Sequence, residues 1–324
     1  MYNVISLFCG CGGVDLGTIG GFTFNKTKYA QHPCKLVYAC DIDQKAIESH
    51  KMNFNTEQTI CTDICEINTD DIPACDILTG GFPCQSFSTV NPTKDPFDDR
   101  ANLYKQMVRI IQAKQPKVFV AENVKGMMTL HKGTIFKKII TAFEEVGYKT
   151  FYSLLNAADY GVPQKRERVI IVGIRNDIWK LKGDFVFPKK THEEKWLPLS
   201  VAVPKLAIEE KKYYFSERAV QGMKNAKKNM KRGLAQNLNE PCLTITSHLA
   251  KVSLNSRDPV LLVDQEKELY RRFTPLEAAR IQSFPDDFKF AGSDTTAYKQ
   301  IGNAVPPVLF WHITDVITKY LSKE

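Results

Sequence analysis

The chain has 324 residues, of which 43% are hydrophobic and 25% are charged, and its formal net charge is +8. This length exceeds what one small hydrophobic core needs, so we expect two domains of unequal size. No stretch approaches the ~18 apolar residues of a membrane-spanning helix, and the N-terminus lacks the layout of a signal peptide. These features exclude a membrane protein and predict a cytoplasmic location.

Strand and helix signals alternate along the first two-thirds of the chain. Short apolar runs bounded by turn residues predict strands, and longer amphipathic stretches predict helices. Their alternation predicts an α/β fold in which a mostly parallel sheet is flanked by helices. The expected strands are residues 2–8, 36–40, 58–62, 75–79, 117–121, 149–155 and 168–174, and the expected helices are residues 43–53, 102–113 and 134–146.

The first expected strand ends in a glycine turn, Phe8–Gly13, where glycines let the backbone approach a ligand closely. Asp41 ends the second strand, where an acid can accept hydrogen bonds from ribose hydroxyls. Asp63 and Ile64 follow the next strand, where an acid and an apolar side chain can hold an adenine. The alternative is that Asp41, like Asp43, caps the following helix. The turn lacks the Gly-Lys-Ser/Thr of a phosphate-binding loop, so S-adenosylmethionine fits better than NAD or a nucleoside triphosphate.

The segment Gly80–Ser88 follows the strand 75–79 and contains Cys84 directly after a proline. It puts a thiol at the carboxyl edge of the sheet, beside a polar loop that runs to Arg100. The active sites of α/β enzymes lie at this edge. Taken alone, Cys84 is equally well explained as a small buried hydrophobe. The nine cysteines have neither zinc-site nor disulfide spacing, so we predict reduced thiols, one of them reactive, and no metal site.

The alternation stops near Phe187, and the sequence to about Tyr270 is irregular and basic. Helical signals resume at residues 274–283 and from Asn303 onward. We therefore predict one domain of residues 1–186 and 271–324, which binds the cofactor, and a smaller irregular domain of residues 187–270. The run Lys224–Arg232 has no acidic residue. Such a run is typical of a solvated helix face, or of a polyanion-binding surface if the chemistry requires one.

Six segments have the form and the order of the motifs of one family, and on them the sequence resembles the DNA cytosine-5 methyltransferases. The resemblance spans almost the whole chain except residues 187–270. It implies a cofactor-binding sheet domain, a target-recognition domain at 187–270, and DNA in the cleft between them. Measured against these motifs, the stretch Gly20–Leu36 is long, so we expect an extra loop there. The six segments are Phe8–Gly13, Gly81–Gln85, Glu122–Val124, Gln164–Arg168, Arg271–Gln282 and Gln300–Val305.

The resemblance implies catalytic roles for four residues. Carbon 5 of cytosine is a poor nucleophile, and a thiolate from Cys84 added at carbon 6 would make it reactive. Glu122 would hydrogen-bond ring nitrogen 3 and the amino group, while Arg168 would hold the base and orient this glutamate, with Arg166 beside the pocket. The base would be flipped out of the duplex. S-adenosylmethionine would give the methyl group and leave as S-adenosylhomocysteine.

The resemblance also implies binding residues. Phe8 and Ile42 would flank the adenine, and the loop from Ser86 to Arg100 would close over the flipped DNA. The expected cofactor-binding residues are Phe8, Gly10, Cys11, Gly12, Gly13, Asp41, Ile42, Asp63, Ile64, Pro83, Leu103 and Asn303. The expected DNA-binding residues are Gln85, Ser86, Ser88, Arg100, Lys227, Lys228, Lys231 and Thr244.

The leading hypothesis is a sequence-specific methyltransferase of double-stranded DNA, the modification half of a prokaryotic restriction system. It has a restriction endonuclease as functional counterpart and no obligatory protein partner evident in the sequence. One alternative is a methylase of transfer RNA, because a branch of this family acts on RNA. A non-catalytic DNA-binding or cofactor-sensing protein is a third reading, which Cys84, Glu122 and Arg168 argue against. An adenine amino-methyltransferase is disfavoured, because its Asp-Pro-Pro-Tyr-type tetrapeptide is absent.

Overall fold

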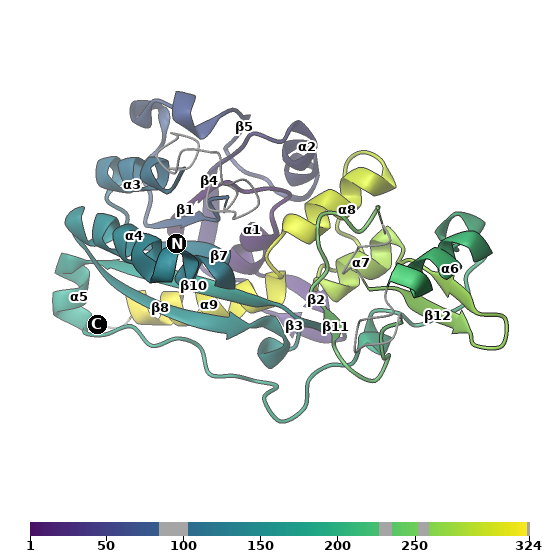
Figure 1. Cartoon of the computed structure of the whole chain (residues 1–324). Coiled ribbons are helices and arrows are strands. Elements are labelled where there is room, and N and C mark those ends of the chain that lie inside the picture. The colour runs from purple at the N-terminus through teal and green to yellow at the C-terminus, as the bar shows by residue number, and fades with distance from the viewer. Residues whose placement is uncertain (84–102, 227–234, 252–258, 323–324) are drawn as a thin grey trace.

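The computed structural model describes residues 1–83, 103–226, 235–251 and 259–322. Its main sheet has seven strands, and β1 is parallel to β4 and β6, β4 to β5, and β6 to β7. Only β10 runs antiparallel to its neighbours β7 and β8. The prediction of a mostly parallel sheet is therefore confirmed (Figure 1). In spatial order the strands are β5 (Gln58–Cys61), β4 (Cys34–Asp41), β1 (Tyr2–Leu7), β6 (Ile77–Gly80), β7 (Val118–Val124), β10 (Glu167–Arg175) and β8 (Tyr148–Asn156).

Helices cover both faces of this sheet, because its central strands are apolar on both sides. Along β10, Ile170 and Val172 pack with α1 and α9, while Val169 and Ile171 pack with α3 and α4. Successive side chains of a strand point to opposite faces, so one strand contributes to both cores. The helices are α1 (Gly13–Ile19), α2 (Gln44–Asn53), α3 (Leu103–Lys114), α4 (Thr134–Glu145), α5 (Asn176–Lys182), α6 (Glu217–Ala226), α7 (Pro275–Ile281), α8 (Asp294–Asn303) and α9 (Pro307–Ser322).

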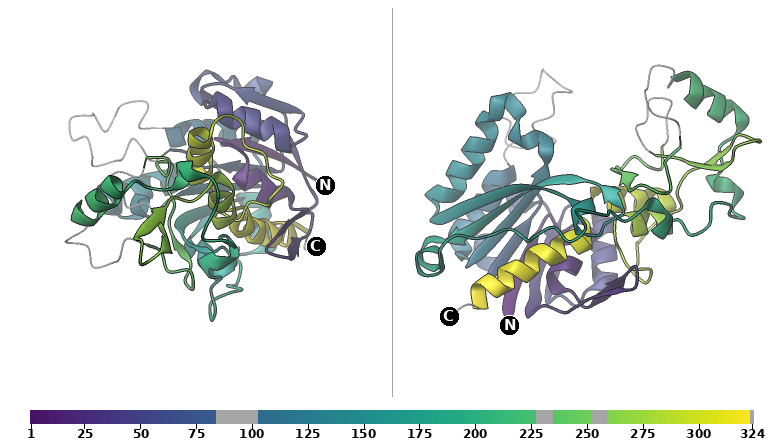
Figure 2. Two further views of the ribbon diagram at one scale, coloured as in Figure 1. Left: turned by 90° about the vertical axis from the view of Figure 1, so that its right-hand side faces the viewer. Right: turned by 90° about the horizontal axis from the view of Figure 1, so that it is seen from below.

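Where the sequence predicts an extra loop, the structure has a hairpin of β2 (Phe22–Phe24) and β3 (Thr27–Tyr29). Its two turn residues, Asn25 and Lys26, have φ angles of 44° and 64°. These are the left-handed values that a two-residue hairpin turn requires, but Asn-Lys is a weaker sequence signal than Asn-Gly. The hairpin packs on α9, since the Tyr29 ring meets Trp311 edge-on at 5.3 Å (Figure 2).

The remaining strands are short and lie outside the main sheet. In the view of Figure 1, α6 and β12 lie at one end of the molecule, away from the seven-stranded sheet. Residues of this region, such as Leu199 and Leu261, share one core with Cys11 and Ile301. The boundaries of the two domains at residues 187 and 270 therefore stay a prediction. The short strands are β9 (Gln164–Lys165) paired with β11 (Cys242–Leu243), and β12 (Leu261–Asp264) paired with β13 (Leu269–Arg271).

Two features of the helices and strands differ from the sequence prediction. The helices α5, α6 and α8 were not expected, and β7 continues to Val124, three residues beyond the expected end. Glu122 therefore lies inside a strand and not after it, because β10 continues the pairing with Ile170 opposite Glu122. No helix among the described residues is long and apolar enough to cross a membrane.

A buried ion pair holds the start of α7. Both guanidinium nitrogens at the end of Arg271 lie 2.7 Å from the carboxylate oxygens of Glu277, and the arginine is fully buried. Removing one partner leaves an uncompensated buried charge, so we expect Glu277→Ala to cost about 3–5 kcal/mol of unfolding free energy. Urea denaturation measures this loss. The control is Asp286→Ala, which breaks an exposed pair with Arg280 and should cost about 0–1 kcal/mol; equal losses for the two variants would contradict the prediction.

Candidate active site and cofactor pocket

The glycine turn, Phe8–Gly13, is a tight connection between β1 and α1. Gly12 has a φ of 99°, and a Cβ atom there would lie 2.2 Å from the ring of Phe54. A Cβ at Gly13 would lie 2.5 Å from the carbonyl oxygen of Val305. Both positions therefore require glycine, one for its dihedral angles and both for close packing.

Asp41 closes the glycine turn from the end of β4. Its carboxylate accepts hydrogen bonds from the backbone N–H of Gly10 at 2.8 Å and of Asp43 at 2.9 Å. Asp43, in contrast, caps α2 by accepting from the N–H groups of Lys45 and Ala46. Burial raises the pKa of Asp41 above its ordinary value, against these two backbone donors. Each oxygen of Asp41 keeps a further lone pair, so the carboxylate can also accept from a ligand hydroxyl.

An exposed apolar side chain lies directly beside this carboxylate. Ile42 is 69% exposed, although it lies in the short connection between β4 and α2. On the neighbouring strand connection, Asp63 accepts a hydrogen bond from the N–H of Cys65, and Ile64 is buried. Arg109 of α3 fixes this connection by donating to the carbonyl oxygens of Ile64 at 3.1 Å and Ile67 at 2.9 Å.

The other expected cofactor residues differ in what they can offer a ligand. Cys11 is buried in the core next to α8, with its sulfur 3.9 Å from the carbonyl oxygen of Gln300, and burial raises its pKa to about 12. Only the backbone of Cys11 is therefore left for a ligand. Pro83 and Asn303 are exposed, and Leu103 is half-buried at the start of α3.

Glu122 and Arg168 form an ion pair on the two antiparallel strands β7 and β10. The Nε of Arg168 lies 2.7 Å from an Oε atom of Glu122, and the two side chains are 12% and 14% exposed. The second carboxylate oxygen of Glu122 leaves little room at Gly81, where a Cβ atom would lie 3.1 Å from it. The pair therefore lies next to the segment that leads from β6 to Cys84.

Asn123 fixes that segment from the same strand. Its amide nitrogen donates to the carbonyl oxygen of Phe82 at 2.9 Å, and the side chain is buried. Asn123 is not among the expected site residues, although it stands in the segment Glu122–Val124. The signal was available, because a polar side chain alternates with Glu122 along a strand and must face the opposite, buried side.

Arg166 is buried, and its guanidinium donates to the carbonyl oxygens of Ile245 at 3.0 Å and Gly302 at 2.9 Å. Burial lowers the pKa of this guanidinium well below its ordinary value. Arg166 thus connects the residues after β9 to the segment after β11 and to the end of α8. Beside it, the buried amide of Gln164 donates to that of Gln282, and sequence analysis assigned no role to either amide.

Several expected DNA-binding residues lie in the parts that the structure leaves undescribed. Thr244 is described, and its hydroxyl donates to the carbonyl oxygen of Lys165 at 2.7 Å. The oxygen of this hydroxyl remains free to accept a further hydrogen bond. The nucleophile expected from the sequence also falls outside the described residues. The expected site residues in these parts are Cys84, Gln85, Ser86, Ser88, Arg100, Lys227, Lys228 and Lys231.

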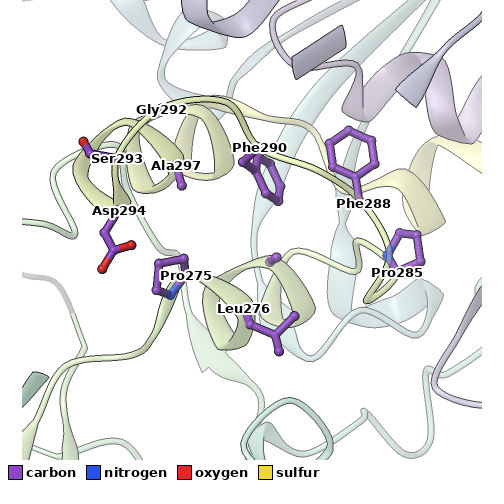
Figure 3. Close-up of a pocket in the computed structure, with 10 residues that line it drawn as sticks. Pro275, Leu276, Pro285, Phe288, Phe290, Gly292, Ser293, Asp294 and Ala297 are labelled. Atoms are coloured by element: carbon purple, nitrogen blue, oxygen red, sulfur yellow. The ribbon is translucent and has the colours of Figure 1, made fainter. Parts of the chain in front are cut away.

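A separate apolar hollow of about 240 Å³ lies between α7 and α8 (Figure 3). Leu276, Phe288 and Phe290 line it together with Asp294, whose carboxylate is held by Lys212 and Tyr213. None of the expected site residues in the described part of the chain lines this hollow, so we assign it no part in the chemistry.

Comparison with known proteins identifies the family. The model of the C-5 cytosine-specific DNA methylases matches residues 2–319. The chain belongs to this family. It is 36% identical to the type II methyltransferase M.NgoFVII of Neisseria gonorrhoeae, covering 94% of this chain and 83% of that protein. It is 35% identical to M1.ScrFI of Lactococcus lactis subsp. cremoris, covering 100% of this chain and 79% of that protein.

Solved structures share the fold at lower identity. A putative DNA modification methyltransferase from an Escherichia coli prophage superposes with a TM-score of 0.73 at 23% identity, over 100% of both chains. The Dnmt2 methyltransferase of S. pombe superposes with a TM-score of 0.74 at 17% identity, also over 100% of both chains. The chain is thus a C-5 cytosine DNA methyltransferase, and S-adenosylmethionine is the general methyl donor of such enzymes. The transfer RNA alternative is not favoured.

Proposed function

We propose that the chain methylates carbon 5 of a flipped-out cytosine in double-stranded DNA, through a covalent adduct with Cys84. The observation that carries this proposal is the Glu122–Arg168 pair, held at 2.7 Å next to the Gly81–Pro83 segment. Arg168 fixes the carboxylate of Glu122, and the next residue, Asn123, holds the segment that leads to Cys84. This arrangement is suited to binding and activating one planar ring.

The residues of the chain carry the following steps. The Cys84 thiolate adds to carbon 6, and the electron pair of the carbon 5–carbon 6 double bond moves to carbon 5, which attacks the methyl group. S-adenosylmethionine supplies this electrophilic methyl group. Glu122 hydrogen-bonds ring nitrogen 3 and the amino group and stabilises the adduct. Water then takes the proton from carbon 5, and the electron pair of that carbon–hydrogen bond restores the double bond and expels the Cys84 thiolate.

The described residues at the ends of β1, β4 and β5 fit a nucleoside cofactor. Asp41 has spare acceptor capacity for ribose hydroxyls, and the exposed Ile42 offers an apolar surface for an adenine face. In this proposal Phe8 covers the other adenine face, and Asp63 meets its amino group. Pro83, Leu103 and Asn303 line the remaining side, and S-adenosylhomocysteine is the product.

Asp41→Ala should weaken binding of S-adenosylmethionine about 10- to 100-fold, because a charged hydrogen bond to a hydroxyl is worth about 1.5–3 kcal/mol. Binding of DNA without cofactor should change little. Isothermal calorimetry measures the first quantity and a gel-shift titration the second. Asp43→Ala is the matched control, since it removes the cap of α2 and leaves the carboxylate of Asp41 in place. Unchanged cofactor affinity in a folded Asp41→Ala protein would remove the ribose assignment.

Residues 187–270 form the target-recognition domain in this proposal, and Thr244 lies among its DNA-facing residues. Gln85, Ser86, Ser88 and Arg100 contact the DNA from the loop beside Cys84. The comparison proteins M.NgoFVII and M1.ScrFI are type II methyltransferases. By this similarity the chain protects DNA in a restriction-modification system, opposite a restriction endonuclease, and acts at the nucleoid in the cytoplasm.

The basic run Lys224–Arg232 should bind phosphates without reading bases. Neutralising Lys227, Lys228 and Lys231 should weaken all duplexes alike and flatten the slope of log affinity against log salt by about 0.9 for each lost phosphate contact. Fluorescence anisotropy at several salt concentrations, with cognate and random duplexes, measures both effects. An altered target sequence with an unchanged salt slope would show that the run reads bases.

Bisulfite sequencing tests the proposed function directly. The purified protein is incubated with S-adenosylmethionine and either a mixed-sequence duplex or bulk transfer RNA. We expect 5-methylcytosine in duplex DNA, at one position of a short recurring sequence, and none in transfer RNA. Methylation confined to RNA, or methylation of adenine in the DNA, would reject the proposal.

A further inference from the structure

Three buried polar side chains gather beneath the glycine turn and have no part in the proposed chemistry. They belong to Cys9 within the glycine turn, Asp15 in the first turn of α1, and His50 in the last turn of α2. Their ligand-type atoms lie within 4.8 Å of one another. The Nε2 of His50 lies 3.0 Å from an Oδ atom of Asp15, and both side chains have no exposed surface.

The cluster joins the two segments that would hold the cofactor. Asp15 stands two residues after the glycine turn, and His50 belongs to the helix that begins beside Asp41 and Ile42. The ring of Phe54 lies 4.6 Å from the His50 ring, and the same Phe54 ring touches the backbone at Gly12. His50 is therefore connected to the glycine turn through two side chains, Asp15 and Phe54.

The end of α2 is also fixed to α8 and to the segment that precedes α8. Ser49 donates to the side-chain oxygen of Gln300 and accepts from the N–H of Ala291 at 2.7 Å. Asn53 exchanges two hydrogen bonds with the backbone of Lys289, at 2.8 and 2.9 Å. Asn303, at the end of α8, lines one side of the proposed cofactor pocket, and Asp41 and Ile42 line another. The last turn of α2 is therefore connected to both sides.

We propose that the Asp15–His50 pair is a positioning unit for cofactor binding, which rests on the proposed function of the glycine turn. A buried carboxylate is costly unless it is paired, so Asp15 holds α1 at the distance from α2 at which His50 can donate to it. Gly10 and Gly12, with left-handed φ angles of 55° and 99°, lie directly before α1, the helix that carries Asp15. The pair thereby sets the shape of the turn before the cofactor arrives.

A metal site is the competing explanation of the same cluster. Cysteine, aspartate and histidine are all zinc ligands, and within the described residues one oxygen of Asp15 and Nδ1 of His50 have no hydrogen-bond partner. However, only three side chains contribute, and two of them already bond to each other. The Asp15–His50 contact at 3.0 Å is made without an ion, whereas three side chains fall short of a four-ligand zinc site, so we favour the pair.

Steady-state kinetics of full-length variants test the proposal. We expect His50→Ala to raise the KM for S-adenosylmethionine about tenfold or more while kcat changes less than about threefold, because the loss is in binding. Affinity for cofactor-free DNA should stay within about twofold, since the turn does not touch DNA in this proposal. His50→Gln, whose amide nitrogen can replace Nε2 as donor to Asp15, should recover most of the loss. Met52→Ala, on the exposed side of the same helix, is the control and should behave like the unchanged protein.

The outcomes separate this proposal from the one it rests on. If Asp41→Ala weakens cofactor binding and His50→Ala does not, the positioning role is wrong and the pocket stands. If neither variant weakens cofactor binding, the pocket assignment itself fails. Should His50→Ala not fold, Asp15→Leu replaces it, because leucine has a similar size but no acceptor for His50, and a KM equal to that of the unchanged protein overturns the proposal. Retention of one zinc per chain after dialysis against a chelator, lost in Cys9→Ser, would also overturn it, in favour of a metal site.

Discussion

Glu122→Gln will lower the rate of methyl transfer about 10²- to 10⁴-fold, the range expected when a general acid–base group is removed. The substitution keeps the size and planar shape of the side chain, but it removes the carboxyl group that pairs with Arg168 at 2.7 Å and that would exchange a proton with ring nitrogen 3 of the adduct. Affinity for S-adenosylmethionine should be unchanged, because Glu122 is not among the residues expected to bind it. Single-turnover transfer of a labelled methyl group to duplex DNA measures the rate.

Glu167→Gln is the matched control for this prediction. Glu167 stands on the adjacent strand β10, one residue before Arg168, and forms an exposed pair with Lys125 at 3.0 Å. Glu167→Gln makes the same chemical change at a neighbouring acidic residue, and we expect this variant to have normal turnover. A rate for Glu122→Gln within a factor of about two of this control would contradict acid–base catalysis by Glu122.

Cys84→Ala will abolish methyl transfer, with a loss of about 10⁴-fold or more, because the variant has no nucleophile to activate carbon 5. The substitution removes only the sulfur atom, so the variant should keep its affinity for cofactor and DNA. Cys65→Ser, at an exposed cysteine, should leave turnover unchanged. Normal methylation by Cys84→Ala would contradict the mechanism, whatever the state of the other cysteines.

The sheet could be predicted from the sequence because its central strands are short, mostly apolar runs bounded by turn residues. β1 and β4 are buried along most of their length, and the connections that follow them carry the glycine turn and Asp41. In a parallel sheet these connections meet at one edge, so spacing along the chain was enough to bring them together. In the structure, the two connections are joined by the hydrogen bond from the N–H of Gly10 to the carboxylate of Asp41.

Other features depend on contacts between distant parts of the chain. Pairing with the antiparallel strand β10 extends β7 as far as Val124. The local sequence at Lys117–Ala121 does not predict this extension. The buried position of Arg166 depends on carbonyl groups of Ile245 and Gly302, far away in the sequence. These contacts could not be read from the segment Gln164–Arg168 itself, and the expected catalytic role of Arg166 stays a prediction.

The hairpin β2–β3 was missed for a local reason. Its turn uses Asn25 and Lys26, both in the left-handed region, and lysine is an unusual residue there. The packing of Phe22 and Tyr29 in the core compensates for this turn. Tertiary packing thus selected a turn that local propensity alone would not favour.

Trapping with 5-fluorocytosine tests the covalent mechanism most directly. Fluorine at carbon 5 cannot leave as a proton does, so the thiol cannot be expelled after methyl transfer. We predict that duplex DNA with this base at the target position is methylated once and stays attached to the protein, only when S-adenosylmethionine is present. Peptide mapping of the product should place the DNA on Cys84. Recovery of the adduct on any of the other eight cysteines, or turnover of this substrate without an adduct, would contradict the account.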